Sequence, residues 1–262
     1  MSISEQLNAL MGGDAGPNDR PMSRFGLTLA KVTNINDDKK LNRVKCLPIG
    51  SPDAEETDWC YVMAPMGGKS CGMFFFPQVN DLVVLAYLDD DPHRPLVLGA
   101  YWNTETVPPV KVENGKAEDY MIRTPKKIEL LFHDEDKKQK VTLTMPSGTV
   151  LTLDDGEQRV QLKDKEGNNA LDMDLKKGEI TLQAKTKLTL AAGKTTVVLE
   201  SGGNITQKGS GTVSIEATNI QEKAKSKLAM EGLTAEMKAS TTADVKASGG
   251  PLTLKGLIVK IN

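Results

Sequence analysis

The feature that most constrains this chain is the lack of aromatic side chains in its C-terminal half. All eleven Phe, Tyr and Trp residues lie between Phe25 and Phe132, and so do all three cysteines. Aromatic side chains normally dominate a globular core, since each buries about 150–250 Å². Residues 133–262 must therefore build any core from small aliphatic side chains, which predicts a narrow interior.

From Val141 onward, apolar and polar residues alternate with a period of two, as in strands with one apolar face. Leu151-Thr-Leu153 and Val213-Ser-Ile215 are typical, and the series continues to Ile261. Glycines mark many of the intervening turns, so the segment is a degenerate repeat of short strands.

A single open ribbon of such strands leaves its apolar face in water and both edges unpaired. Ordering it costs about 1–2 kcal/mol per residue in backbone entropy, which exposed aliphatic side chains do not offset. A single-chain solenoid with longer coils would cover the face, and so would three identical ribbons wound about a three-fold axis. Short strands and small aliphatics favour the second arrangement, so we predict an intertwined triple-stranded β-helix in a homotrimer for residues 141–262.

The preceding half contains short β segments between turns rich in Gly, Pro and Asp. Strands are predicted at 26–33, 44–47, 60–63, 73–76, 82–88 and 96–98. Those at 73–76 and 82–88 are continuous apolar runs, typical of strands buried on both faces. Five or six such strands indicate a small Greek-key barrel, and the predicted fold class is all-β.

Composition argues against several functions. With 33 basic and 35 acidic residues the net charge is −2, which argues against a nucleic-acid partner. Cys46, Cys60 and Cys71 form no CxxC pair, so we expect buried thiols rather than a disulfide scaffold or zinc site. His93 and His133 leave little for metal or acid–base chemistry. The sequence has neither a long apolar run nor a signal-peptide pattern at its start, which predicts synthesis in the cytoplasm.

A set of short motifs runs from Trp59 to Asn103. It comprises a Trp before a strand, Ala-Pro-x-Gly-Gly, Gly-x-x-Phe-x-Pro-x-Val-x-Asp, Asp-Pro-x-Arg-Pro-x-Val-Leu-Gly and a closing aromatic-Asn. Together with an Arg-Val step upstream, these motifs resemble the OB domain of the VgrG and phage baseplate spike family. The motif residues are Arg43, Trp59, Pro65, Gly67, Gly68, Gly72, Phe76, Pro77, Asp81, Asp91, Pro92, Arg94, Pro95, Gly99, Trp102 and Asn103.

The sequence departs from the family pattern at three positions where that pattern often has glycine. Asn42 precedes the Arg, Asn80 precedes the Asp, and Asp90 stands before Asp-Pro. Asn tolerates positive φ better than most residues, so we expect the two Asn replacements to be mild.

The resemblance implies a structural, non-enzymatic protein without a cofactor. It predicts an N-terminal arm at 1–22, an OB domain at 23–106, a connector at 107–140 and a needle at 141–262. The needle of such a homotrimer would pierce a target envelope when a sheath contracts. The implied location is the baseplate of an injection particle or virion. The implied partners are a separate hub protein at the OB end, a PAAR-type tip protein at the C-terminal end and possible effector cargo.

Two further sites are predicted for these partners. The hub contact is assigned to the apolar side of the first segment, at Ile3, Leu7, Leu10 and Met11. The tip platform is assigned to the last strand, at Leu257, Ile258, Val259, Lys260, Ile261 and Asn262.

Two other function classes are compatible with a β-rich repeat. A single-chain β-solenoid could be a carbohydrate-active enzyme with Asp172 and Asp174 in a groove, but the repeat has no aromatic sugar platform. A trimeric surface adhesin would carry secretion and anchoring segments, and neither is found in the sequence.

Overall fold

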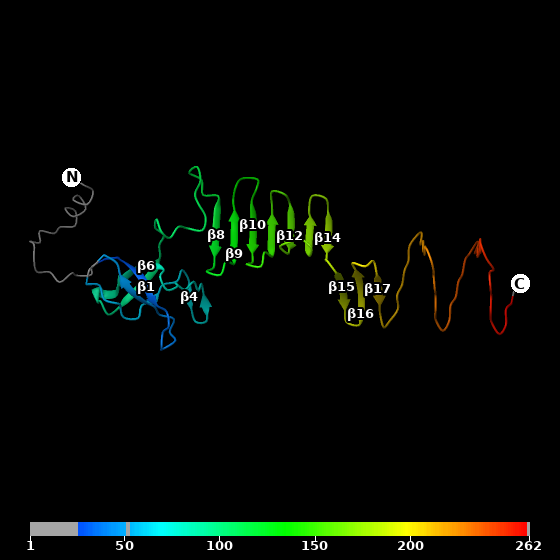
Figure 1. The fold of residues 1–262 in the computed structure, drawn as a ribbon, viewed down its shortest axis with the longest axis horizontal. Helices are drawn as coiled ribbons and strands as arrows, with labels where there is room; N and C mark the ends of the chain where they lie inside the picture. Colours follow the sequence, from blue (N-terminus) through cyan, green and yellow to red (C-terminus); the bar gives the residue numbers. More distant parts are fainter. Residues whose placement is uncertain (1–25, 51–52, 261–262) are drawn as a thin grey trace, which may run out of the picture. The chain divides into compact units, whose positions relative to one another are not determined.

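The computed structural model describes residues 26–50 and 53–260, and this part of the chain is almost entirely β or extended (Figure 1). Within it the helical element is a short 3-10 turn, Leu88–Asp90, and no helix is long and apolar enough to cross a membrane. The chain divides into a unit that ends at Thr186 and a unit that begins at Lys187. The predicted all-β class is confirmed.

Five strands of the first unit form one sheet. They are β1 (Thr28–Asn34), β2 (Lys45–Pro48), β3 (Tyr61–Val62), β6 (Leu82–Tyr87) and β7 (Pro95–Ala100), in the order β2-β1-β6-β7-β3. The β3–β7 pair is parallel and the other pairs are antiparallel. Val44 and Cys60, which directly precede β2 and β3, exchange backbone hydrogen bonds of 3.0 and 2.7 Å. This bridge joins the two edges of the sheet and closes a small barrel, as the sequence predicted.

The barrel core comes from alternate residues of these strands. Period-two alternation sends every second side chain inward, as the burial pattern of β6 illustrates. The buried set is Ala30, Val32, Val44, Cys46, Cys60, Val83, Leu85 and Val97. These side chains are small, so the interior is filled without a fully buried aromatic ring among the described residues.

The prediction of a strand at 73–76 is wrong. The chain instead forms a small hairpin just before it, from β4 (Gly67–Gly68) and β5 (Cys71–Gly72). Phe74 and Phe75 are exposed, while Phe76 stacks on Phe74 and packs against the core. The expectation of three buried thiols is also wrong for Cys71, because it lies in the exposed hairpin.

The first unit also contains a seven-stranded antiparallel meander. Its strands are β8 (Asp119–Arg123), β9 (Glu129–His133), β10 (Lys140–Thr144), β11 (Val150–Asp154), β12 (Arg159–Lys163), β13 (Ala170–Asp174) and β14 (Glu179–Gln183). Each strand pairs with its sequence neighbours. The meander begins within the segment 107–140; the domain boundaries drawn from the sequence remain a prediction.

The second unit opens with a three-stranded antiparallel sheet of β15 (Lys187–Ala192), β16 (Thr195–Glu200) and β17 (Ile205–Lys208). Beyond Lys208 the described chain forms no further strand ladder. The sequence predicted strands that intertwine between copies from residue 141 onward. Up to Lys208 the strands pair instead with neighbours in the same chain, because short loops join them, and residues 209–260 form no ladder within the described chain. Pairing between copies remains a prediction.

Candidate functional site

One face of the seven-stranded sheet carries two continuous columns of apolar side chains. Residues directly opposite one another in an antiparallel ladder project from the same face. The first column is Tyr120, Phe132, Val141, Leu153, Val160, Met173 and Ile180, and the second is Ile122, Leu130, Leu143, Leu151, Leu162, Leu171 and Leu182. We call these residues the apolar face.

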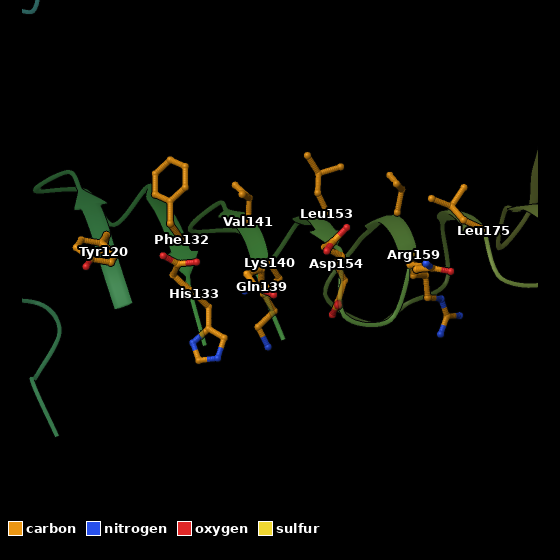
Figure 2. A pocket seen from close by; sticks show the side chains of 14 residues that line it. Tyr120, Phe132, His133, Gln139, Lys140, Val141, Leu153, Asp154, Arg159 and Leu175 are labelled. Carbon is orange, nitrogen blue, oxygen red and sulfur yellow. The ribbon is translucent and has the colours of Figure 1, made fainter. Parts of the chain in front are cut away.

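The apolar face remains open to solvent in the single chain. Tyr120 keeps 55% and Ile180 keeps 67% of its surface exposed. Figure 2 shows Phe132 and Leu153 projecting together from one side of the sheet, with the polar His133 on the other. A contiguous apolar patch of this kind marks an association surface.

The opposite face of the sheet is mostly polar, although Met121 and Leu131 also lie on it, and several of its charged side chains form ion pairs. The His133 Nδ1 and Asp119 Oδ1 atoms lie 2.7 Å apart, and Arg123 Nε lies 2.7 Å from Glu129 Oε1. Surface pairs of this kind contribute little stability but keep the face solvated. The two faces therefore differ in chemistry, since charged side chains of one face form pairs within the chain whereas apolar side chains of the other stay exposed.

The same pattern continues in the second unit. Leu188, Leu199 and Ile205 align across β15, β16 and β17, and Leu190 lies opposite Val197. Three of these side chains, Leu190, Leu199 and Ile205, are exposed. The uncovered apolar character is thus a property of both units.

The carboxylates Asp172 and Asp174 lie on the polar face, and both accept hydrogen bonds from neighbouring residues. Asp172 accepts hydrogen bonds from Arg159 and from Gln161 Nε2, the latter at 2.7 Å, and these donors lower its pKa to about 2. The Lys177 backbone N–H lies 3.0 Å from Asp174 Oδ1 and lowers the pKa of that carboxyl as well. Both carboxylates are therefore held by neighbouring donors on the polar face.

In the barrel, the motif residue Arg43 forms hydrogen bonds with a carboxylate in the loop between β1 and β2. Its Nε and Nη2 atoms donate to the two carboxylate oxygens of Asp37 at 2.9 and 2.7 Å. The backbone N–H groups of Lys39 and Leu41 donate to the same carboxylate. The Arg43 guanidinium, followed by these amides, holds the pKa of Asp37 well below its usual range. Sequence reasoning missed Asp37, although its distance of six residues from Arg43 on a polar turn was a signal.

The guanidinium of Arg43 also lies near two rings from the neighbouring edge of the barrel. Its Cζ is 5.6 Å from the centroid of Trp59 and 5.9 Å from that of Tyr61. Contacts at this distance are cation–π interactions. Arg43 and Trp59, which lie apart in the sequence motifs, are thus brought together at the seam where the barrel closes.

All three positions that depart from glycine in the family pattern have a positive φ. The values are 54° for Asn42, 78° for Asn80 and 57° for Asp90. Asn and Asp tolerate this conformation best among the residues that have a side chain. The sequence expectation for Asn42 and Asn80 agrees with this geometry.

The remaining motif residues shape turns and strand ends. Asp81 accepts from the Gln78 N–H, Asp91 from the His93 N–H, and Asn103 from the Glu105 and Thr106 N–H groups. Two of the motif prolines, Pro77 and Pro95, are buried, whereas Pro65, Pro92, Arg94 and Trp102 are exposed. The motif glycines lie in strand ladders, where Gly67 pairs with Gly72, Gly68 with Cys71, and Gly99 with Val84. At Gly72 a Cβ would lie 2.6 Å from the Met66 carbonyl oxygen, so the hairpin requires glycine there.

The two predicted partner sites are only partly within the described residues. Ile3, Leu7, Leu10 and Met11 lie outside them, as do Ile261 and Asn262. Leu257, Ile258 and Val259 are exposed apolar residues next to the exposed Lys260. Both assignments remain predictions.

Residues 28–102 match the family model of the type VI secretion system/phage-baseplate injector OB domain. This segment is similar to an injector OB domain. The match spans the five strands that form the barrel, and no curated protein matches the chain. An injector OB domain supports a structural role in a baseplate or spike, which agrees with the resemblance found in the sequence.

The apolar face extends further toward the N-terminus than sequence reasoning placed the β repeat. Tyr120 and Ile122 in β8, with Leu130 and Phe132 in β9, form its first two rungs. The alternation Tyr-x-Ile and Leu-x-Phe was the available signal. This alternation was missed because the repeat was sought in the segment without aromatic residues, and β8 and β9 each contain one.

Proposed function

We propose that this protein is the central spike of a contractile injection machine. In the proposed homotrimer, the apolar faces of three copies meet on a common axis, and the resulting needle pierces a target envelope when a sheath contracts. The observation that carries this proposal is the uncovered apolar face that follows an injector OB domain in the same chain. The role is mechanical and requires neither a catalytic residue nor a cofactor.

Association through the apolar face is energetically favourable. A fully buried Leu, Ile or Phe side chain contributes about 1.5–3 kcal/mol relative to an exposed one. The face has only two columns, so it is a narrow strip along the stacked strands. Three narrow strips enclose a slender interior that suits aliphatic side chains, and the charged opposite faces keep the assembly soluble.

The first prediction concerns mass. We expect light scattering of the purified chain to give three times the 28.4 kDa mass of one copy, at concentrations down to the detection limit. A mass of one copy would contradict the proposal. A mass of two copies would replace the three-fold prism with a two-sheet sandwich.

The ends of the spike are proposed to bind two different partners. The exposed apolar side chains of Leu257, Ile258 and Val259 support a platform for a small PAAR-type tip protein. We expect a chain lacking residues 257–262 to lose capture of the tip protein in a pull-down while retaining its trimer mass. A chain lacking residues 1–20 serves as the matched deletion, and it should instead fail to join the hub during particle assembly. Undiminished tip capture or normal assembly would reject the corresponding partner site.

A further inference from the structure

The outer side of the OB barrel carries a second apolar surface, on the neighbouring strands β2, β1 and β6. Two rows of residues cross these strands side by side. The rows are Ile49, Leu29 and Val84, and Leu47, Lys31 and Leu82. We call the five apolar members of these rows the barrel patch.

The barrel patch points away from the barrel core. Its residues alternate along their strands with the buried core residues, and alternate side chains of a strand lie on opposite faces. Leu29 keeps 46% and Ile49 keeps 49% of its surface exposed, and the other members are exposed or half-buried. A contiguous apolar surface on the outside of a small barrel marks a site of contact.

The sequence of β6 is independent evidence that this side of the barrel is covered. A strand with one face in water normally alternates apolar and polar residues, whereas a continuous apolar run is typical of a strand buried on both faces. The outward positions of β6 are Leu82, Val84 and Ala86, and none of them is polar. In the described chain only the inward face of β6 is buried, so the outward face still lacks its cover.

The chain itself contains a segment of matching chemistry before β1. Ile3, Leu7, Leu10 and Met11 recur at the spacing of one helical face. A helix over residues 3–11 is about 13 Å long, and three neighbouring strands are about 10 Å across. The apolar side of this segment therefore matches the barrel patch in size as well as in chemistry.

Residues 12–25, which we call the tether, connect the segment to the barrel. At about 3.3 Å per residue the tether reaches up to about 45 Å, several times the width of the barrel patch. It contains Gly12, Gly13, Gly16 and Pro17, which are residue types that favour turns. A tether of this length gives the segment a roughly millimolar effective concentration at the barrel, which favours it over an untethered partner.

Charge also favours this occupant over a second barrel. Lys31 lies between Leu47 and Leu82, and it forms no ion pair among the described residues. The tether offers the carboxylates Asp14 and Asp19, which are opposite in sign to Lys31. Two barrel patches packed against each other would instead bring two Lys31 ammonium groups together, and such like-charge contacts are unfavourable.

We propose that the apolar side of residues 3–11 packs on the barrel patch of its own chain. This inference goes beyond the proposed function, because it concerns a contact within one chain and holds whether or not that chain forms a spike. The contact supplies the missing cover of β6. It also occupies the four apolar residues that were assigned to the hub, so a hub reaches them only by displacing the barrel.

Hydrogen exchange on the purified full-length protein tests the contact. We expect the amides of residues 4–11 to exchange at least roughly tenfold more slowly than in a synthetic peptide of residues 1–25, because a helix this short is marginal unless it packs. Exchange at the rate of the peptide would overturn the proposal. The mass measured on the same sample tests the proposed trimer separately, so the two can fail independently.

Leu29→Asp and Leu41→Asp form a matched pair on the barrel. Leu41 lies in the β1–β2 loop outside the barrel patch and is 48% exposed, close to the value for Leu29. We expect Leu29→Asp to return residues 4–11 to the exchange rate of the peptide and Leu41→Asp to leave their protection unchanged. Equal protection in the two variants would contradict the proposed contact.

A second pair of variants leaves the barrel sequence intact. Leu10 lies on the apolar side of the segment, whereas Ala9 lies on the opposite side of the same helix. We expect Leu10→Asp to abolish the protection of residues 4–11 and Ala9→Asp to retain it. Loss of protection in both variants, or in neither, would count against packing through the apolar side.

Photo-crosslinking identifies the barrel that holds the segment. The full-length chain is co-expressed with a chain that lacks residues 1–20 and carries Lys31→Arg, which changes the mass of its Leu29 peptide. A photoreactive diazirine analogue replaces methionine, and Met11 is then present only in the full-length chain. We expect crosslinks from Met11 to the Leu29 peptide that retains Lys31. Crosslinks to the Lys31→Arg peptide would place the segment on another copy, and crosslinks to neither peptide would place it elsewhere; either result overturns the proposal.

Discussion

Replacing Leu151 by Asp on the apolar face is expected to abolish the trimer. Leu151 stands in the second column, between Leu143 and Leu162 on the adjacent strands. In the proposed assembly the Leu151→Asp substitution would bring a carboxylate from each copy into a narrow apolar interior, where each unpaired ion costs several kcal/mol. Light scattering should therefore report the 28.4 kDa mass of one copy.

The control for this variant is Thr152→Asp, which places the same charge one residue along the strand. Thr152 pairs with Thr142 and Gln161 on the polar face. Because alternate residues of a strand point to opposite faces, this variant should keep the trimer mass. A Leu151→Asp protein that remains trimeric would show that the apolar face is not the surface on which copies associate.

Replacing Leu85 by Ala is expected to destabilise the OB domain by about 2–5 kcal/mol. Leu85 lies in β6 and is fully buried with Val32, Val44 and Val83. The substitution removes most of the side chain from a closed barrel that has little freedom to collapse around the cavity. Both tryptophans, Trp59 and Trp102, belong to this domain, so their fluorescence in a urea titration measures its unfolding.

Leu27→Ala provides the same chemical change at a side chain that is 70% exposed. This variant should unfold within about 0.5 kcal/mol of the parent protein, as most surface substitutions do. If Leu85→Ala and Leu27→Ala shifted the transition equally, Leu85 would not lie in a packed barrel core.

Much of the OB domain was predictable from local sequence. The turns rich in Gly, Pro and Asp bounded five of the six predicted strands, because these residues adopt turn conformations that interrupt a ladder. Asn42 and Asn80 were expected to tolerate positive φ, and both have it. The exception was 73–76, where three consecutive Phe residues resembled a buried strand but lie outside the sheet, two of them exposed.

Contacts between particular side chains were harder to predict from local sequence. The clasp of Arg43 on Asp37, and the approach of Trp59 to the same guanidinium, depend on how the β1–β2 loop meets the barrel seam. For Arg43 and Asp37 the sequence offered opposite charges six residues apart on a polar turn, but it offered no signal that Trp59 lies beside them. Asp172 is a similar case, since its role as an acceptor for Arg159 depends on strand register.

The sequence by itself determined that the C-terminal half alternates apolar and polar residues, that its strands as far as Lys208 carry one apolar face, and that its apolar side chains from Val141 onward are small. These properties follow from a period of two and from the sizes of the side chains, both of which are local. Only the tertiary structure decided which backbone groups pair. From Asp119 to Lys208 the partners lie in the same chain, and from 209 to 260 the described chain offers none. A period-two pattern is the same for a strand that pairs with its own chain and for one that pairs with another, so the choice depends on turn length and three-dimensional path.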